Sequence, residues 1–201
     1  MGRTMPMVAR RIVMYPKRKP EMEKDLKEDW FHNKKELEKI VTSEMNVLEL
    51  GSYVGRSTNW FAEHAKLVYA VDHWLGSPDE IHMDDIGGCI GMFDQFLVNT
   101  WDNKDNIYPV RAWTVIGMRH LYNYNCIPDL IYVDAAHTYE GVWQDLEVAD
   151  ELFPEAIITG DDYSWGKGQP IKKAVERFCK AHNYDVEVSR DWFYKIIKDS
   201  S

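Results

Sequence analysis

Side chains that accept protons or bind metals gather in two short segments of the sequence. Segment 134–141 reads DAAHTYEG and contains Asp134 and His137, and segment 160–163 reads GDDY and contains Asp161 and Asp162. Carboxylates that lie close together repel one another unless they are protonated or neutralised, and a hard divalent cation such as Mg²⁺ is one solution. A neutral imidazole can accept a proton near physiological pH. These residue types favour general-base chemistry beside a metal ion.

The two segments are expected to face the same edge of the fold. Each follows a short apolar run, 130–133 for the first and 156–159 for the second. In an open α/β sheet, ligands gather beyond the carboxyl ends of the strands, so residues that close neighbouring strands share one rim. A purely structural role stays open for each side chain. Asp161 or Asp162 could cap a turn, and His137 could bond to backbone at the start of a helix.

A second candidate site is the glycine turn 49–55, which reads ELGSYVG. It leaves the apolar run 47–50 and enters a helical pattern, and glycine lets the backbone turn tightly and approach a ligand closely. Asp72 lies 21 positions after Gly51, at the end of the next apolar run, where a carboxylate can accept both hydroxyls of a ribose. The turn is not the dinucleotide fingerprint G-x-G-x-x-G, because position 53 is Tyr. By itself such a turn could equally be an ordinary connection between a strand and a helix, but its position, with Asp72 at the next strand end, favours a nucleotide-type ligand other than a dinucleotide.

The elements that must position these residues alternate between strand and helix patterns. The predicted strands are 47–50, 67–71, 107–110, 130–133, 156–159, 184–188 and 192–197. Helical patterns cover one or two leading helices within 20–41, the stretch from 55 to 65, and 115–124, 139–153 and 170–183. This order predicts an α/β, Rossmann-like doubly wound fold. Its seven-stranded sheet is mostly parallel, with an antiparallel C-terminal hairpin.

The chain of 201 residues is predicted to form one domain, 20–201, behind a basic N-terminal arm, 1–19. Residues 1–20 hold six basic and no acidic side chains, although the whole chain has a net charge of −9. We expect this arm to be solvated and to contribute little to the core. The acidic stretch 76–106 interrupts the alternation and is interpreted as an insertion or lid, partly helical at 92–98.

Composition narrows the classes of partner. A net charge of −9 disfavours nucleic acid, because the protein and the phosphate backbone would repel each other. No apolar run approaches the length of a membrane span, so we expect no membrane partner. The three cysteines form no C-x-x-C pair, which argues against a disulfide framework or a zinc site and fits a reducing, cytoplasmic setting. The oligomeric state stays open, and a homo-oligomer is compatible with the sequence.

The motif E-x-G-x-x-x-G at 49–55 resembles the first motif of class I S-adenosylmethionine-dependent methyltransferases. The order of elements over residues 46–197 is similar to theirs. This resemblance implies S-adenosylmethionine as cofactor, with its methionine end at the glycine turn, its ribose on Asp72 and its adenine near segment 111–113. For Trp113, packing in the core is an equal alternative. The cofactor-binding residues that we assign are Glu49, Gly51, Ser52, Tyr53, Gly55, Asp72, Ala112, Trp113 and Asp134.

Segments 134–141 and 160–163 resemble those of a particular branch, the sugar O-methyltransferases and cephalosporin-hydroxylase-like proteins. In that branch a D-x-x-H segment and a paired acidic segment surround a metal. The resemblance implies that Asp134, Asp161 and Asp162 bind Mg²⁺, that His137 is the general base and that Asp134 also belongs to the catalytic site. The reaction it implies is methylation of a hydroxyl on a small-molecule acceptor, such as a sugar or glycoside.

Tryptophans offer a candidate platform for such an acceptor. Trp74, Trp165 and the acidic insertion are interpreted as its frame, because aromatic faces suit the apolar faces of sugars. The chain has eight tryptophans, so core packing is the ordinary alternative for each.

Two other classes of function fit parts of the sequence. An NAD-dependent oxidoreductase also needs a glycine turn and a ribose-binding acid, but Tyr53 stands where its fingerprint has the middle glycine. A non-catalytic Rossmann-like binding module would keep the fold and use the basic arm for docking. A hydroxylase-like protein with the same acidic rim is a further variant. The intact carboxylates and His137 favour a methyltransferase.

Overall fold

The computed structural model describes residues 15–21, 31–76 and 91–198. Their centre is a seven-stranded sheet with the strand order β3-β2-β1-β4-β5-β7-β6. The strands are β1 (Asn46–Leu50), β2 (Leu67–Asp72), β3 (Ile107–Arg111), β4 (Leu130–Val133), β5 (Ile157–Gly160), β6 (Asp185–Ser189) and β7 (Phe193–Ile197). β1 to β5 pair in parallel, whereas β7 pairs antiparallel with both β5 and β6. The predicted mostly parallel sheet with an antiparallel C-terminal hairpin is confirmed.

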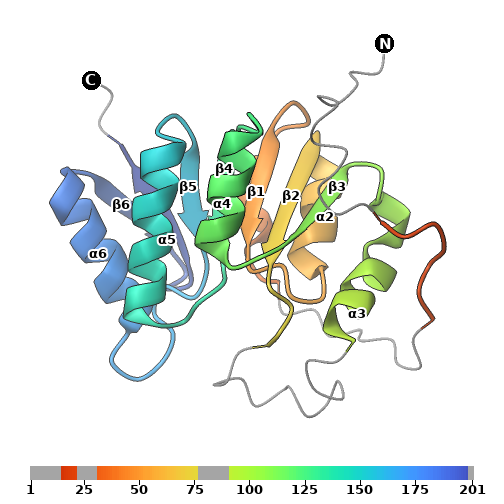
Figure 1. The fold of residues 1–201 in the computed structure, drawn as a ribbon. Helices are drawn as coiled ribbons and strands as arrows, with labels where there is room; N and C mark the ends of the chain where they lie inside the picture. The colour runs from red at the N-terminus through yellow and green to blue at the C-terminus, as the bar shows by residue number, and fades with distance from the viewer. Residues whose placement is uncertain (1–14, 22–30, 77–90, 199–201) are drawn as a thin grey trace.

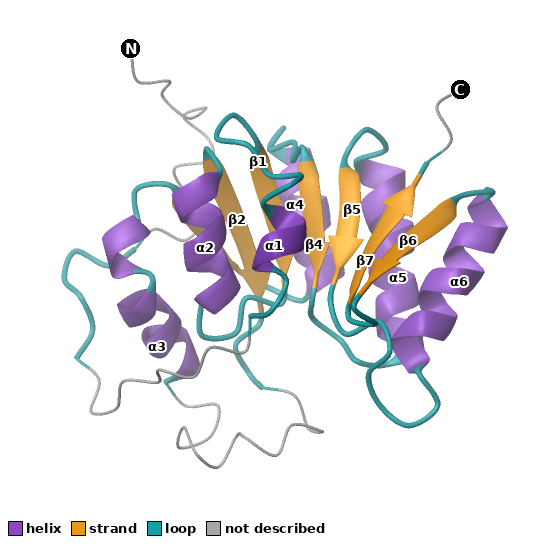
Figure 2. Cartoon of the chain, turned by 180° about the vertical axis from the view of Figure 1, so that it is seen from behind, coloured by secondary structure: helices purple, strands orange, loops and turns teal. Residues whose placement is uncertain are grey.

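Helices cover both faces of this sheet. They are α1 (Lys34–Leu37), α2 (Arg56–His64), α3 (Met92–Asn99), α4 (Thr114–Asn123), α5 (Tyr139–Leu152) and α6 (Pro170–His182), with a 3-10 turn at Trp101–Asn103. In Figure 1, α4, α5 and α6 lie in front of the sheet, and the reverse view of Figure 2 shows α1, α2 and α3 on the other face. A parallel sheet covered on both faces has strands buried on both sides, which explains their continuous apolar sequences.

Each face of the sheet has its own apolar core. On the α4–α6 face, Leu50, Val133 and Ile158 of the sheet pack with Leu146 of α5 and Phe178 of α6. On the opposite face, alternate strand residues such as Val47, Val68 and Tyr132 pack with Phe61 of α2 and Phe96 of α3. Successive strand residues point to opposite faces, so each central strand contributes to both cores.

The register of the central strands fixes where the candidate site lies. Leu50 of β1 is opposite Val133 of β4, and Val133 is opposite Gly160 of β5. The residues that directly follow these three therefore lie side by side at the carboxyl edge of the sheet. That edge is at the bottom of the sheet in Figure 2. The glycine turn and the two acidic segments are thus brought together.

The N-terminal part of the domain is described only in part. Helical spacing within 20–41 favoured one or two leading helices; the described residues there contain one, α1, and residues 22–30 lie outside the described part. Tyr15, within the predicted arm, is half-buried, and its hydroxyl lies 2.6 Å from Thr100 Oγ1 after α3. Much of the predicted lid, 77–90, is likewise not described, whereas its expected helix at 92–98 is present as α3. None of the described helices is long and apolar enough to span a membrane.

Candidate active site

The turn between β1 and α2 is built around two glycines with left-handed backbone. Gly51 has φ 89° and Gly55, the residue before α2, has φ 85°. A Cβ on Gly51 would lie 2.0 Å from the backbone oxygen of Asp134, so the turn and the end of β4 can touch only if residue 51 is glycine. This contact joins the predicted cofactor turn to the predicted catalytic segment.

The side chain of Glu49 hydrogen-bonds to the glycine turn and to α2. Its side chain is fully buried and accepts hydrogen bonds from Ser52 Oγ, at 2.6 Å, and from Thr58 Oγ1 of α2. Burial raises the pKa of the Glu49 carboxyl to about 6, because a charged form loses its hydration there. The Glu49 carboxyl thus links β1, the glycine turn and α2 through hydrogen bonds.

Asp72, at the end of β2, faces the same turn. One carboxylate oxygen accepts the backbone N–H of Tyr53 at 2.9 Å, and the other accepts that of Trp74 at 2.6 Å. A carboxylate has about four acceptor positions, so two remain for further donors such as the hydroxyls of a ribose. The Trp74 indole donates to the backbone oxygen of Tyr53 at 2.7 Å, which fixes the geometry further.

Trp113, just before α4, is exposed over 63% of its surface, which excludes the core-packing alternative. Its ring meets the ring of His73 edge to face, with centroids 4.2 Å apart. Ala112 hydrogen-bonds through its backbone N–H to the backbone oxygen of Asp72, which fixes Trp113 beside the β2 end. Sequence reasoning missed His73, although its position next to Asp72 was a usable signal. An exposed indole beside the ribose-type carboxylate is a suitable platform for an adenine.

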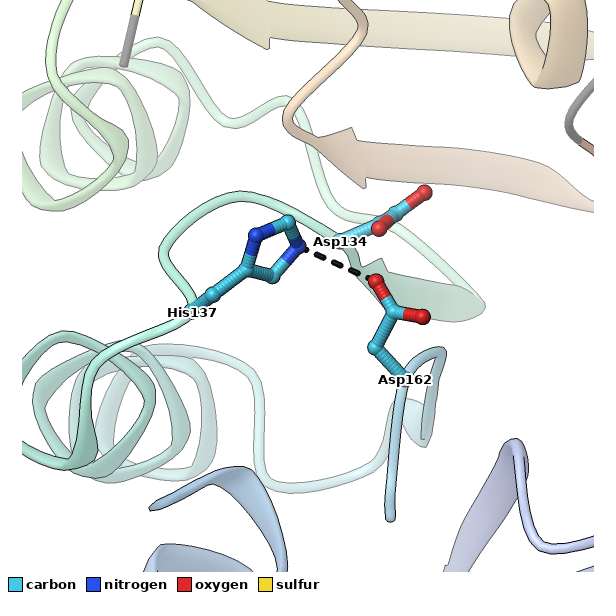
Figure 3. Close-up of side chains that lie close together, drawn as sticks. All are labelled: Asp134, His137 and Asp162. Atoms are coloured by element: carbon cyan, nitrogen blue, oxygen red, sulfur yellow. Dashed lines mark ion pairs between the residues drawn. The ribbon is translucent and has the colours of Figure 1, made fainter. Parts of the chain in front are cut away.

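Asp134, His137 and Asp162 form the acidic cluster at the ends of β4 and β5 (Figure 3). His137 Nε2 lies 3.1 Å from Asp162 Oδ2, and the two side chains point toward each other. One ligand atom from each of the three residues lies within 4.8 Å of the others, the one such group found among the described residues. Asp162 reaches this position through a left-handed backbone, with φ 57°.

Asp161 lies outside this cluster, contrary to the expectation that it would bind a metal together with Asp134 and Asp162. Its Oδ2 accepts a hydrogen bond from the Tyr132 hydroxyl at 3.1 Å, and its Oδ1 accepts one from the backbone N–H of Asp162 at 2.7 Å. β5 ends at Gly160, and the left-handed backbone of Asp162 turns the chain there, so only one of the two carboxylates enters the cluster. Burial, and then the neighbouring charge of Asp162, raise the pKa of Asp161.

The two tryptophans expected to frame the acceptor have different environments. Trp74 is fully buried and packs against Phe93 and Phe96, so its ring is part of the core. Trp165, in the loop after β5, is 37% exposed, and its ring lies against that of His137 with centroids 4.7 Å apart. Of these two tryptophans, it is Trp165 that presents an aromatic surface beside the acidic cluster.

Residues 48–163 match the model of the methyltransferase domain family, and this span covers the glycine turn, Asp72 and the acidic cluster. The chain therefore belongs to the methyltransferase domain family, whose members are class I S-adenosylmethionine-dependent enzymes. Among curated protein sequences, none matches this chain.

Solved structures of methyltransferases share the fold. An rRNA methylase from Streptococcus thermophilus is 13% identical, with a TM-score of 0.54 over 83% of this chain and 93% of that chain. Precorrin-6y C5,15-methyltransferase from Geobacter metallireducens is 15% identical, with a TM-score of 0.56 over 78% and 80%. Fibrillarin from Aeropyrum pernix, solved with natively bound S-adenosyl-L-methionine, is 11% identical, with a TM-score of 0.53 over 78% and 67%. At these identities the likeness shows the fold alone.

The residues present fit S-adenosylmethionine. Gly51 lets the glycine turn lie directly against the end of β4, Asp72 keeps acceptor capacity for ribose hydroxyls, and Trp113 offers an exposed indole. The family match also argues against the nicotinamide-dependent alternative, for which the turn lacks a glycine at position 53.

Proposed function

We propose that this protein transfers the methyl group of S-adenosylmethionine to a hydroxyl oxygen of a small acceptor, such as a sugar or glycoside. The observation that carries the proposal is the pairing of His137 with Asp162, 3.1 Å apart, beside Asp134 at the sheet edge that holds the glycine turn. An imidazole next to a carboxylate is suited to removing a proton, and a hydroxyl acceptor must lose one.

The reaction needs little covalent chemistry from the protein. The acceptor oxygen forms a bond to the methyl carbon, the carbon–sulfur bond breaks, and its electron pair stays on sulfur, which becomes a neutral thioether. The hydroxyl proton passes to the imidazole of His137, and the adjacent Asp162 carboxylate stabilises the resulting cation. Most of the rate comes from holding oxygen, carbon and sulfur in line. The general base contributes typically ~10²–10⁴-fold.

We further propose that Asp134 and Asp162 hold a Mg²⁺ ion. Mg²⁺ takes oxygen ligands, often one or two carboxylates together with substrate and water, and the two Asp side chains supply that donor set. When bound, such an ion lowers the pKa of a coordinated acceptor hydroxyl. Asp162 has a second carboxylate oxygen beside the one that faces His137, so pairing and coordination are compatible. Asp161 is left out of the ligand set because the group whose ligand atoms lie together consists of Asp134, His137 and Asp162, while the Asp161 carboxylate accepts from the Tyr132 hydroxyl.

The surroundings of His137 favour an acceptor with a sugar ring or an aryl group. The face of Trp165 lies next to the imidazole and is partly exposed, and aromatic faces suit the apolar face of a sugar ring or an aryl group. The Streptococcus thermophilus protein that shares the fold is an rRNA methylase. For this chain, the net charge of −9 favours a small molecule over a polynucleotide. A non-catalytic binding module is the remaining alternative, and an activity assay separates the two.

The test uses S-adenosylmethionine carrying a ¹³C-methyl group and a panel of glycosides, polyols and catechols, with amino sugars as matched nitrogen acceptors. We expect the label on oxygen, visible from its ¹³C shift, with activity lost in chelator and restored by Mg²⁺. His137→Gln should lower turnover by about 10²-fold or more. Label on nitrogen or carbon would refute the O-methylation proposal. Full activity in chelator would refute the proposed role of the metal. Unchanged turnover in His137→Gln would refute the proposed role of His137 as general base.

A further inference from the structure

A buried hydrogen-bonded chain connects the N-terminal segment of the domain to the acidic cluster. Asn33 Nδ2 donates to the hydroxyl of Tyr132 at 3.1 Å, and that hydroxyl donates to Asp161 Oδ2 at 3.1 Å. Asp161 Oδ1 in turn accepts the backbone N–H of Asp162 at 2.7 Å. The chain thus ends at the residue whose carboxylate faces His137.

The first members of this chain are held rigidly. Tyr132 is fully buried in β4, and its ring packs edge to face against Phe31 and Phe61. Asn33 is 3% exposed, and its backbone oxygen accepts the N–H groups of Glu36 and Leu37 at the start of α1. A buried polar group without a partner costs free energy, so this arrangement resists rearrangement of any one member.

The last member of the chain needs such support. Asp162 has φ 57°, a backbone conformation that a non-glycine residue adopts at a cost and that persists only when its surroundings fix it. Two hydrogen bonds fix this backbone: Asp162 N–H donates to Asp161 Oδ1, on the side of the core, and the Asp162 backbone oxygen accepts the N–H of Trp165 at 2.8 Å. A change at Tyr132 would therefore reach His137 through the position of Asp162.

We propose that Asn33, Tyr132 and Asp161 are positioning residues that hold Asp162 against His137, and that Asp161 acts through this chain rather than as a metal ligand. The inference rests on the proposed function in that it takes the His137–Asp162 pair as the proton-accepting group. It assigns roles to Asn33 and Tyr132, whose side chains hydrogen-bond to each other and, through the Tyr132 hydroxyl, to Asp161. It also accounts for a polar side chain at the centre of an otherwise apolar strand.

The experiment follows the imidazole ¹⁵N signals of His137 in the full-length protein, at one fixed pH, in chelator and without cofactor or acceptor. Asp162→Asn gives the reference shift for loss of the pair. Tyr132→Phe keeps the buried ring but removes the hydroxyl, and we expect it to shift the His137 signals in the same direction as Asp162→Asn. Tyr69→Phe is the matched control, because it removes a hydroxyl from a buried tyrosine of β2 that lies in the core on the opposite face of the sheet. It should leave the His137 signals unchanged.

Asp161→Ala provides a second variant in case Tyr132→Phe folds poorly, and it should shift the signals likewise because Asp162 N–H loses its acceptor. Unchanged His137 signals in folded Tyr132→Phe or Asp161→Ala would overturn the proposal. So would an Asp162→Asn variant without any shift, because the pair itself would then be absent. Neither metal, cofactor nor acceptor is in the sample, so failure of the proposed methylation would appear only in the labelling assay.

Discussion

Gly51 and Asp134 are in contact through their backbones: a Cβ on Gly51 would lie 2.0 Å from the Asp134 carbonyl oxygen. The glycine turn and the acidic cluster therefore form one unit, and a side chain at position 51 must displace one from the other. We expect Gly51→Ala to abolish S-adenosylmethionine binding in calorimetric titration and to lower the thermal midpoint. Gly166→Ala is the matched control, because its φ is also positive, at 76°, but its nearest neighbour is 3.7 Å away. Equal effects of both substitutions would show that backbone strain alone is responsible.

Asp72 is expected to bind the cofactor ribose. Asp72→Ala should weaken S-adenosylmethionine binding by about 100-fold, because hydrogen bonds to a charged group contribute about 1.5–3 kcal/mol each and every 1.4 kcal/mol is about tenfold. Asp129→Ala is the control, because Asp129 also accepts a backbone N–H, that of Asn46, at the opposite end of β1. Cofactor affinity within threefold of the unsubstituted protein in Asp72→Ala, about 0.65 kcal/mol, would contradict the assignment.

The sheet was predictable because strands that are buried on both faces have apolar residues at consecutive positions in the sequence. The strand 130–133 was predicted with the bounds found in the structure, and the others shift by a residue, since continuous apolar runs mark strands of a parallel sheet. The glycine turn and Asp72 were found for a related reason, as they directly follow two such runs. Strand ends are where this fold places its ligands.

The unpredicted features depend on contacts between distant segments. Asp161 and Asp162 are adjacent in sequence, but only the structure shows that one carboxylate points to Tyr132 and the other to His137. Helical spacing within 20–41 predicted a helix such as α1, but not that Asn33, the residue before α1, is a partner of Tyr132, 99 positions away. Such pairings leave no periodicity in the sequence. Exposure of Trp113 likewise depends on what β2 and α4 leave uncovered.

Trp113 is expected to contribute to cofactor affinity and little to stability. Trp113→Ala should weaken S-adenosylmethionine binding by about tenfold, because stacking on an aromatic side chain is worth about 1–3 kcal/mol per base. The free energy of unfolding should change by no more than about 0.5 kcal/mol, as for exposed residues generally. Trp192→Ala in the β6–β7 hairpin, where the indole is 45% exposed, is the control for loss of a surface tryptophan. A large stability loss without any loss of affinity would refute the platform role.

Asp145 of α5 makes stability depend on pH. Its side chain is 2% exposed, and burial raises its pKa to about 7, although Thr114 Oγ1 donates to it at 2.5 Å. A carboxyl whose pKa is raised on folding binds more protons in the native state, so its contribution destabilises progressively as pH rises from about 4 to about 7. Asp145→Asn should therefore stabilise the protein more at pH 8 than at pH 5. The difference should be on the order of 3 kcal/mol, because each pKa unit is worth about 1.4 kcal/mol.

Urea unfolding at the two pH values measures this effect. Asp102→Asn on the exposed surface should show no such difference between pH 5 and pH 8. An equal loss of stability in Asp145→Asn at both pH values would mean that the carboxylate is charged and needed in the folded protein.

The central claim is that the methyl group of S-adenosylmethionine lies beside the Asp134–His137–Asp162 cluster and a cation held there. Paramagnetic relaxation of ¹³C-methyl-labelled S-adenosylmethionine tests it without a known acceptor, with Mn²⁺ in place of Mg²⁺. The account predicts strong broadening of the methyl signal by Mn²⁺ in the unsubstituted protein, none with Mg²⁺, and loss of the broadening in Asp162→Asn at equal cofactor occupancy. A methyl signal that saturating Mn²⁺ leaves sharp, or broadens equally in Asp162→Asn, would contradict it.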